Sequence, residues 1–463
     1  MNRLTKWTDR LLLVLTVFTV TFFIYRDFDI RMLYGFAALG LILLVSFLRR
    51  LALDRPLEPE PVRGALLWLA AVVLVNFLRP DSQHSADTIS YIISMVVCVA
   101  FVWLWQDSPA ESGWSTKLLL AAAVGMTAFV LLYRLFPDFI YAAVYPHLSD
   151  VAQRYFDYFL PRSYGMAFGG YTFTDYVIFC GIAVCWGRIA AAERRSVRDL
   201  LRLGAILIFG IAILTLGRRG ELLGAVVLCA LTMLMLCTPK MRILLILGGG
   251  ALLAAALWLF LRFLPQLREI EIFYRYVRTI ENLVNGYDFT SGRTDLFALA
   301  IEGFRSAPIF GIGFDQFYTL VNPLLTDIEG NVMQDAHNIY LQFLCEIGLV
   351  GTVLVLLPMF WLLLTTLRAM TAARKQEGKR GVEALTVSFL IQSYLLFLGL
   401  LDPTFQKIVF WCFYAVSAML LLTGMEQSGW RPNDPLSRLF GKTAALASPI
   451  GRRVWEFLRT FFH

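Results

Sequence analysis

Four side chains in the second half of the sequence have the chemistry to handle a phosphorylated substrate. Arg218 and Arg219 are adjacent, Arg293 precedes a helical pattern, and His337 follows Asp335 by two positions. The guanidinium group of arginine binds phosphate oxygens through two parallel hydrogen bonds, and a neutral imidazole is a general base near neutral pH. These residue types predict a site that binds an anion, above all a phosphate, beside a general base.

The three arginines lie at positions where a positive charge is disfavoured. Arg218 and Arg219 fall in a tight outward turn between two apolar segments, where the positive-inside rule disfavours paired arginine. Arg293 would begin a helix, where the dipole disfavours a cation unless an anion is bound there. Simpler explanations remain open for both places: Arg218 and Arg219 reach lipid headgroups or pair with Glu221, and Arg293 pairs with Asp295.

His337 is the sharpest of these signals. It opens the apolar segment that re-enters the membrane, and Asp335 is a plausible cap for that helix. At about 100° per residue, Gly348 and Gly351 share a stripe with His337, which predicts that the imidazole faces protein. We expect nearby cations to keep it neutral, as a general base requires. The alternative is a histidine with a structural role only.

The composition limits which elements can position these groups. Of 463 residues, 58% are hydrophobic, 14% aromatic and only 16% charged, with a mean hydropathy of +0.66. Soluble proteins carry about a quarter charged residues, so a cytosolic enzyme, a disordered chain and a nucleic-acid binder are excluded. The net charge of +7 fits cytoplasmic loops of a membrane protein. The 7 Cys lie in apolar stretches, which predicts neither disulfides nor a metal site.

Apolar segments long enough to cross a bilayer recur along the chain, and we count about twelve. They span 11–25, 32–48, 64–78, 89–106, 117–135, 172–190, 203–217, 222–237, 243–262, 339–366, 385–401 and 408–424. With the first segment a retained anchor and both termini cytoplasmic, most of the 41 Lys and Arg residues fall on the inner side. The sequence therefore predicts an all-α, multi-pass membrane protein with an even number of spans.

The long connections divide this chain into four parts. Helices 1 to 9 occupy 1–262, a large helical loop on the outer side occupies 263–336, and helices 10 to 12 occupy 337–424. The remainder, 425–463, is a cytoplasmic tail, and from Pro449 onward its apolar and basic residues fall on opposite sides of a helix, as in an interfacial amphipathic helix. A loop as long as 263–336 in a compact fold is usually functional, and we expect it to cover the site.

The spacing around His337 resembles a known motif. His337 and Asn338 are followed by nine residues and then by Gly348 and Gly351. This run is similar to the signature of the O-antigen ligase and polysaccharide polymerase superfamily of membrane glycosyltransferases (WaaL and Wzy type), whose fold is GT-C-like.

Two further segments carry the same resemblance, which covers 205–365. Arg219 and Leu223 match an Arg-x-x-x-Leu motif, and Ser291–Arg293 followed by Pro308–Gly313 resembles the part of the outer loop that holds a second arginine. A third arginine of the family precedes a turn with Asn-Pro before the sixth helix. Arg162 occupies that place without the Asn-Pro, so its role carries over only in part.

The resemblance implies a reaction. A glycan would pass from a polyprenyl (undecaprenyl) pyrophosphate carrier to a hydroxyl of the lipid A core, at the outer face of the inner membrane, without metal or other cofactor. Arg219 and Arg293 would stabilise the leaving pyrophosphate, assisted by Arg218 and Arg162. His337 would take the acceptor proton in an inverting attack. Asn338, Leu223, Gly348 and Gly351 would be structural parts of the motifs.

Three alternatives stay open at this point. A polymerase that joins one lipid-linked glycan to another would use the same donor and the same motifs. A metal-dependent membrane glycosyltransferase would use Asp27 and Asp29, although Arg26 and Arg31 flank these acids and explain them by local pairing. A lipid-linked glycan flippase or transporter would place ionisable groups near the bilayer midplane, where this sequence has almost none.

Overall fold

The structure, a computed structural model, is all-helical in the part of the chain that it describes. It describes residues 60–82, 112–148, 171–192, 196–286, 293–321, 335–402 and 408–446, with scattered single residues elsewhere. The helices are α3 (Pro61–Phe77), α5 (Ser112–Leu135), α6 (Pro137–Val144), α8 (Tyr171–Ala191), α9 (Val197–Thr215), α10 (Arg219–Leu236), α11 (Pro239–Arg262), α12 (Leu264–Glu269), α13 (Glu271–Val284), α14 (Arg293–Ser306), α15 (Ile339–Arg374), α16 (Val382–Leu398) and α17 (Ile408–Ser428).

The chain is a multi-pass membrane protein. Among the described residues, five helices are long and apolar enough to cross a bilayer: Gly113–Leu135, Thr174–Ala191, Arg219–Leu236, Lys240–Arg262 and Ile339–Arg374. Shorter apolar helices run over Pro61–Phe77 and Val382–Leu398. The predicted first span lies outside the described residues, as do most of the predicted second and fourth, so the count of twelve stays a prediction.

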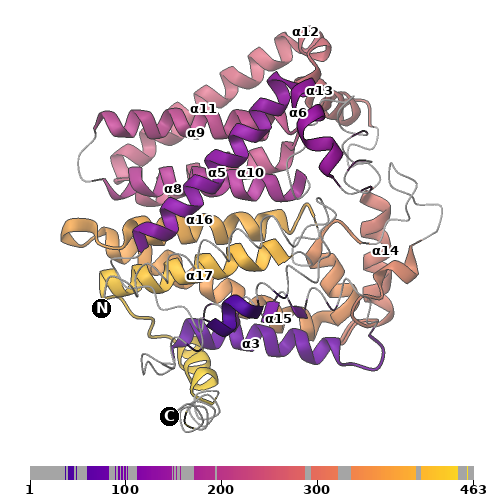
Figure 1. The fold of residues 1–463 in the computed structure, drawn as a ribbon, viewed down its shortest axis with the longest axis vertical. Helices are drawn as coiled ribbons and strands as arrows, with labels where there is room; N and C mark the ends of the chain where they lie inside the picture. The colour runs from indigo at the N-terminus through magenta and orange to yellow at the C-terminus, as the bar shows by residue number, and fades with distance from the viewer. Residues whose placement is uncertain are drawn as a thin grey trace.

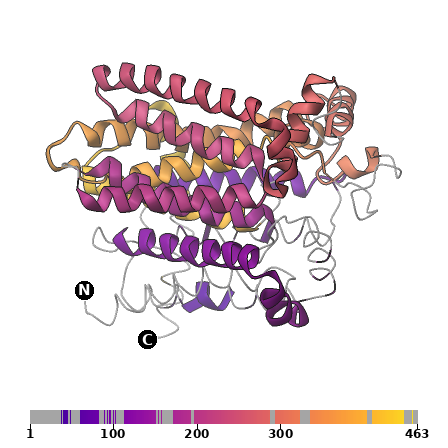
Figure 2. The same ribbon diagram turned by 90° about the horizontal axis from the view of Figure 1, so that it is seen from above.

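The long helices lie side by side around α16 (Figures 1 and 2). Nearly every side chain of α16 is buried, and α8, α10, α15 and α17 all pack against it. Two of its polar side chains bond to neighbouring helices: the Gln392 Nε2 atom donates to Thr366 Oγ1 at 3.0 Å, and Ser388 Oγ donates to the Ser417 carbonyl at 2.7 Å. Such pairing is what a helix buried within a membrane bundle requires. At the edge of the bundle, the apolar α11 has no buried residue in its spanning window, so it faces lipid.

The helices of the predicted outer loop gather at one end of the bundle. α12, α13 and α14 lie within 263–336, and Figure 1 shows them beyond the ends of the long helices. The same end holds the first residues of α8, α10 and α15. The opposite end carries the last residues of these three helices. The residues expected to act together are therefore carried to one end of the molecule.

α15 is broken at Gly348, which has φ 66° and ψ −174°. The break frees backbone groups that pair with the segment 308–313 of the outer loop. Ile312 and Gly313 donate to the Cys345 and Glu346 carbonyls at 2.9 and 3.0 Å. Leu349 and Val350 donate in turn to the Pro308 and Ile309 carbonyls at 2.9 and 3.1 Å. The predicted stripe for helix packing is therefore wrong at Gly348, which instead seats a loop.

We expect Gly348→Ala to destabilise the protein by about 2 kcal/mol or more. A residue with a side chain costs roughly 1–2 kcal/mol in the left-handed region, and a Cβ here would overlap the Ile309 carbonyl oxygen. The thermal unfolding midpoint in detergent measures the effect. Gly249→Ala is the matched control, because α11 leaves open space around Gly249. Equal midpoints for the two variants would contradict this account of the kink.

The chain after α17 returns to the bundle. A helix over 435–446 places Phe440 against α3 and α15, with its ring 6.0 Å from that of Trp68 and 4.9 Å from that of Trp361. The amphipathic helix predicted from Pro449 onward lies outside the described residues, apart from the single residue Glu456. The span predicted to end at 424 continues to Ser428.

Candidate functional site

His337 lies just outside α15, not in its first turn. The helix begins at Ile339, and its cap is Asn338, whose side chain accepts hydrogen bonds from the Tyr340 and Leu341 amides at 3.1 Å. Asp335, the predicted cap, instead accepts from the His337 amide at 3.0 Å. His337 has φ 47°, so a helical wheel does not apply to it. The prediction of Asp335 as the cap was wrong. Asn338 caps the helix, and His337 lies immediately before this cap.

The imidazole of His337 faces carboxylates. Its Nδ1 atom is 3.5 Å from Asp335 Oδ1 and 3.9 Å from Asp402 Oδ1, and its side chain is 29% exposed. We expected cations beside this ring, but the groups that the structure describes around Nδ1 are acidic. Nδ1 lies near both carboxylates without a hydrogen bond to either in the described part of the chain, and Nε2 is left for another partner.

The turn that follows α16 brings the site together. The Gly399 carbonyl accepts from the Ile339 amide at 2.9 Å, which fastens the start of α15 to this turn. The Leu401 carbonyl accepts from Arg293 Nη1 at 2.8 Å. Asp402 approaches His337 with one carboxylate oxygen and pairs with Arg218 through the other. Residues at or just before the starts of α10, α14 and α15 therefore meet at a turn that the sequence analysis did not single out.

Asp402 is the residue that sequence reasoning missed. It is buried, it follows the apolar α16, and it precedes a proline. An acidic residue at the outer end of an apolar span is a signal of its own, because such residues are costly in a membrane and usually pair inside the protein. Its link to His337 and Arg218 depends on the folded chain.

Arg218 is held among three carboxylates. Its Nε atom is 3.0 Å from Asp175 Oδ2, and its Nη2 atom is 2.9 Å from Glu221 Oε1 and 3.2 Å from Asp402 Oδ2. The side chain is only 10% exposed. The simpler explanation, pairing with Glu221, therefore holds, with two further acids that the sequence did not reveal. This guanidinium ties α8 and α10 to the turn after α16, and its geometry does not favour the predicted contact with pyrophosphate.

Arg219 begins α10 with a partly exposed side chain. The next residue, Gly220, lies so close to the turn after α16 that an added Cβ would meet the Leu401 side chain. The first turn of α10 is thereby packed beside the turn that binds Arg293. Leu223, the apolar residue of the same motif, is 61% exposed and points away from the site. Within this motif, only the arginine end is near the other candidates.

Arg293 is the first residue of α14, as the helical pattern predicted. Its side chain is partly exposed and reaches across to the Leu401 carbonyl, while Asp295, the alternative partner, is exposed. Gly351 is buried within α15. Arg162, Asp27 and Asp29 lie outside the described residues, as do Ser291 and Gly292.

Neither a metal cluster nor a disulfide occurs in the part of the chain that the structure describes. No group of three or more His, Cys, Asp or Glu side chains could hold a metal ion there. Six cysteines in this part are free thiols, and all are buried or half-buried: Cys180, Cys185, Cys229, Cys237, Cys345 and Cys412.

One comparison with known proteins bears on this site. Residues 204–356 match the Wzy_C family model, described as O-antigen ligase. The search of curated proteins gave no match. The matched range contains Arg218, Arg219, Arg293 and His337, whereas Asp175 and Asp402 lie outside it.

Proposed function

We propose that this chain is a membrane enzyme of the O-antigen ligase family, whose model residues 204–356 match, and that it transfers a glycan from undecaprenyl pyrophosphate to a hydroxyl of the lipid A core. The observation that carries the proposal is the meeting of Arg293 and His337 at the Leu401–Asp402 turn, with Arg219 on the adjoining turn of α10. Arginines for a leaving phosphate and a base for an acceptor are thereby close together.

The proposed step is an in-line displacement at the anomeric carbon of the donor sugar. The acceptor oxygen forms a bond to this carbon while the bond from the carbon to the pyrophosphate oxygen breaks. The electron pair leaves with the pyrophosphate, whose growing charge Arg219 and Arg293 stabilise. Attack from the opposite side inverts the configuration of the anomeric carbon.

His337 receives the proton that the acceptor hydroxyl loses. Its Nδ1 atom faces Asp335 and Asp402, which supports Nε2 as the basic atom. A carboxylate beside Nδ1 stabilises the imidazolium that forms. In this proposal Arg218 acts indirectly, because it pairs with Asp402, the buried carboxylate near the base.

The proposed setting is the outer face of the inner membrane. Twelve spans with both termini cytoplasmic put 263–336 and the three arginines of the motifs on that face, within reach of a lipid-linked donor and a lipid-anchored acceptor. The remaining parts, 1–262, 337–424 and the tail 425–463, would supply the membrane bundle and its inner anchor. Arg162 would assist at the donor phosphates from the connection over 136–171, which the same topology puts on the outer face.

We expect Arg219→Ala and Arg293→Ala each to lower the transfer rate on the order of 10²–10³-fold, because each removes a group that stabilises charge only as the pyrophosphate leaves. Transfer from undecaprenyl pyrophosphate-linked glycan to lipid A core by the purified protein measures this, with and without a chelator. Arg268→Ala is the control, since Arg268 lies in the same outer loop with a side chain 62% exposed. Loss of activity with chelator, or wild-type rates in both variants, would overturn the proposal.

A polymerase of the same family would use an identical donor site, so the acceptor must be identified separately. A strain that lacks the protein is examined by polysaccharide gel. Loss of all long chains from lipid A identifies a ligase, whereas single repeat units on lipid A identify a polymerase.

A further inference from the structure

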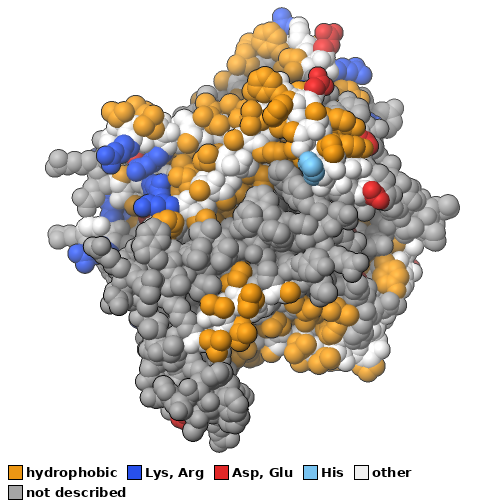
Figure 3. All heavy atoms as spheres, in the orientation of Figure 1, with side chains coloured by type: hydrophobic (Ala, Val, Ile, Leu, Met, Phe, Trp, Pro, Cys, Tyr) orange, Lys and Arg blue, Asp and Glu red, His pale blue; other side chains and the backbone are white. Residues whose placement is uncertain are grey.

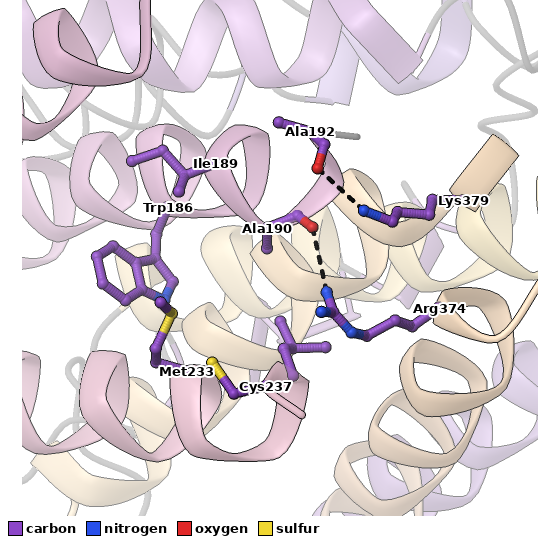
Figure 4. A pocket seen from close by; sticks show the side chains of 9 residues that line it. Trp186, Ile189, Ala190, Ala192, Met233, Cys237, Arg374 and Lys379 are labelled. Carbon is purple, nitrogen blue, oxygen red and sulfur yellow. Dashed lines mark hydrogen bonds between the residues drawn. The ribbon is translucent and has the colours of Figure 1, made fainter. Parts of the chain in front are cut away.

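A cavity lies at the end of the bundle opposite the candidate site. It has a volume of about 180 Å³ and is lined by the ends of α8, α10 and α15 and by the loop before α16 (Figure 4). α10 and α15 begin beside the candidate site, at Arg219 and Ile339, and run the length of the bundle before reaching this cavity. The cavity and the transfer site are therefore on opposite faces of the membrane.

Two cations form one side of this cavity. Arg374 Nη1 donates to the Ala190 carbonyl at 3.5 Å, and Lys379 Nζ donates to the Ala192 carbonyl at 3.0 Å. These bonds complement the negative end of α8, but each uses one donor of a group that has several. Two described carboxylates at this end pair elsewhere, Glu383 with Arg188 and Asp434 with Arg368. Among the side chains that the structure describes, none forms an ion pair with Arg374 or Lys379, so two positive charges lie at one wall of the cavity.

The other side of the cavity is apolar. Trp186 and Met233 face the cations across the opening in Figure 4, and Ile189 and Leu236 complete this wall. A soluble anion gains nothing from such a wall, whereas a lipid presents a charged head and an apolar chain at once. Lys and Arg side chains also gather at this end of the molecule, opposite α14 (Figure 3), as the cytoplasmic surface of a membrane protein requires.

We propose that this cavity binds an anionic glycerophospholipid of the cytoplasmic leaflet. The phosphate lies between Arg374 and Lys379, and an acyl chain follows the apolar wall formed by Met233 and Leu236. Basic pockets between membrane helices on the cytoplasmic side bind anionic lipid headgroups in this way. The bound lipid joins the ends of α8 and α10 to the connection between α15 and α16, and it takes no part in the transfer reaction.

Titration of the purified full-length protein with dioleoyl phosphatidylglycerol in detergent, read by the thermal unfolding midpoint, tests the site. Arg374→Gln with Lys379→Gln keeps a donor for each α8 carbonyl but removes both charges. We expect this double variant to bind the lipid roughly 30-fold more weakly than the wild type. Lys375→Gln with Arg380→Gln is the matched control: it removes the same charge from the same connection, and neither residue lines the cavity. It should bind as the wild type does.

A charge-preserving variant, Arg374→Lys with Lys379→Arg, separates loss of charge from loss of fold, and we expect it to keep at least a third of the wild-type affinity.

Dioleoyl phosphatidylcholine and inorganic phosphate are the comparison ligands, and each should raise the unfolding midpoint far less than the anionic lipid. Equal weakening of the two Gln pairs would overturn the site, because it would mean that only net charge matters. An equal effect of phosphatidylcholine would show that the headgroup charge is not recognised, and an equal effect of phosphate would show that the ligand is not a lipid. Either result would also overturn the proposal.

Discussion

Arg218→Ala is expected to prevent stable folding, whereas Arg219→Ala, one residue later, is expected to leave the protein folded. Arg218 is the cation that Asp175, Glu221 and Asp402 share, and all three carboxyl groups are buried. Removing one partner of a buried ion pair typically costs about 3–5 kcal/mol, because the remaining charge is left without compensation. A loss of this size is a large part of the roughly 5–15 kcal/mol that stabilises an ordinary protein.

The amount of protein in the membrane and its unfolding midpoint in detergent measure this difference. Adding Asp175→Asn to Arg218→Ala should recover part of the lost stability, since it removes one of the stranded carboxylates. The two single variants differ by one position and carry the same change in charge, which makes each the control for the other. If Arg218→Ala has the unfolding midpoint of the wild type while Arg219→Ala has a lower one, the roles assigned here to the two arginines are reversed.

His337→Ala is expected to abolish transfer in a protein that still folds and binds its donor. General base catalysis contributes about 10²–10⁴-fold to a rate, so the variant should fall to or near the limit of detection. The side chain lies before α15 and is partly exposed, so its removal leaves no large cavity in the core. Transfer by purified protein and binding of the lipid-linked donor are measured on the same preparation.

His147→Ala serves as the comparison for His337→Ala. His147 is an exposed histidine at the end of a short helical turn, Tyr145–His147, in the connection between α6 and α8. The His147→Ala variant should transfer glycan at the wild-type rate. Near-normal transfer by the His337 variant would exclude this histidine as the base, and loss of donor binding would assign it to the donor instead.

The fold could be read from the sequence wherever apolar runs are long. The span predicted over 172–190 corresponds to α8, and the helical pattern from Arg293 corresponds to α14. These predictions hold because membrane helices must satisfy their backbone locally and expose apolar side chains. Arg219, Arg293 and His337 were also predicted to lie at the same end of the bundle. Each lies at or beside the start of a helix, and the predicted topology puts these helix starts on one face.

The contacts of the site could not be read in this way. Arg218 and Arg219 are equivalent in sequence, and their difference comes from Asp175 and Asp402, which lie far away along the chain. The wheel drawn from His337 to Gly348 assumed an unbroken helix. A glycine in an apolar run gives no sign of whether it permits close helix packing or a positive φ, and only the partner segment 308–313 decides between the two.

The cluster around Arg218 also sets an order on how the chain can assemble. Arg218 is synthesised 43 residues after Asp175, and Asp402 follows another 184 residues later. When α8 first leaves the ribosome, its acid has no guanidinium partner, and the full set exists only after α16 has been made. This end of the bundle must therefore close late in synthesis. A nascent chain that stops short of Asp402 lacks the turn that gathers the helices, so it cannot complete the cluster around Arg218.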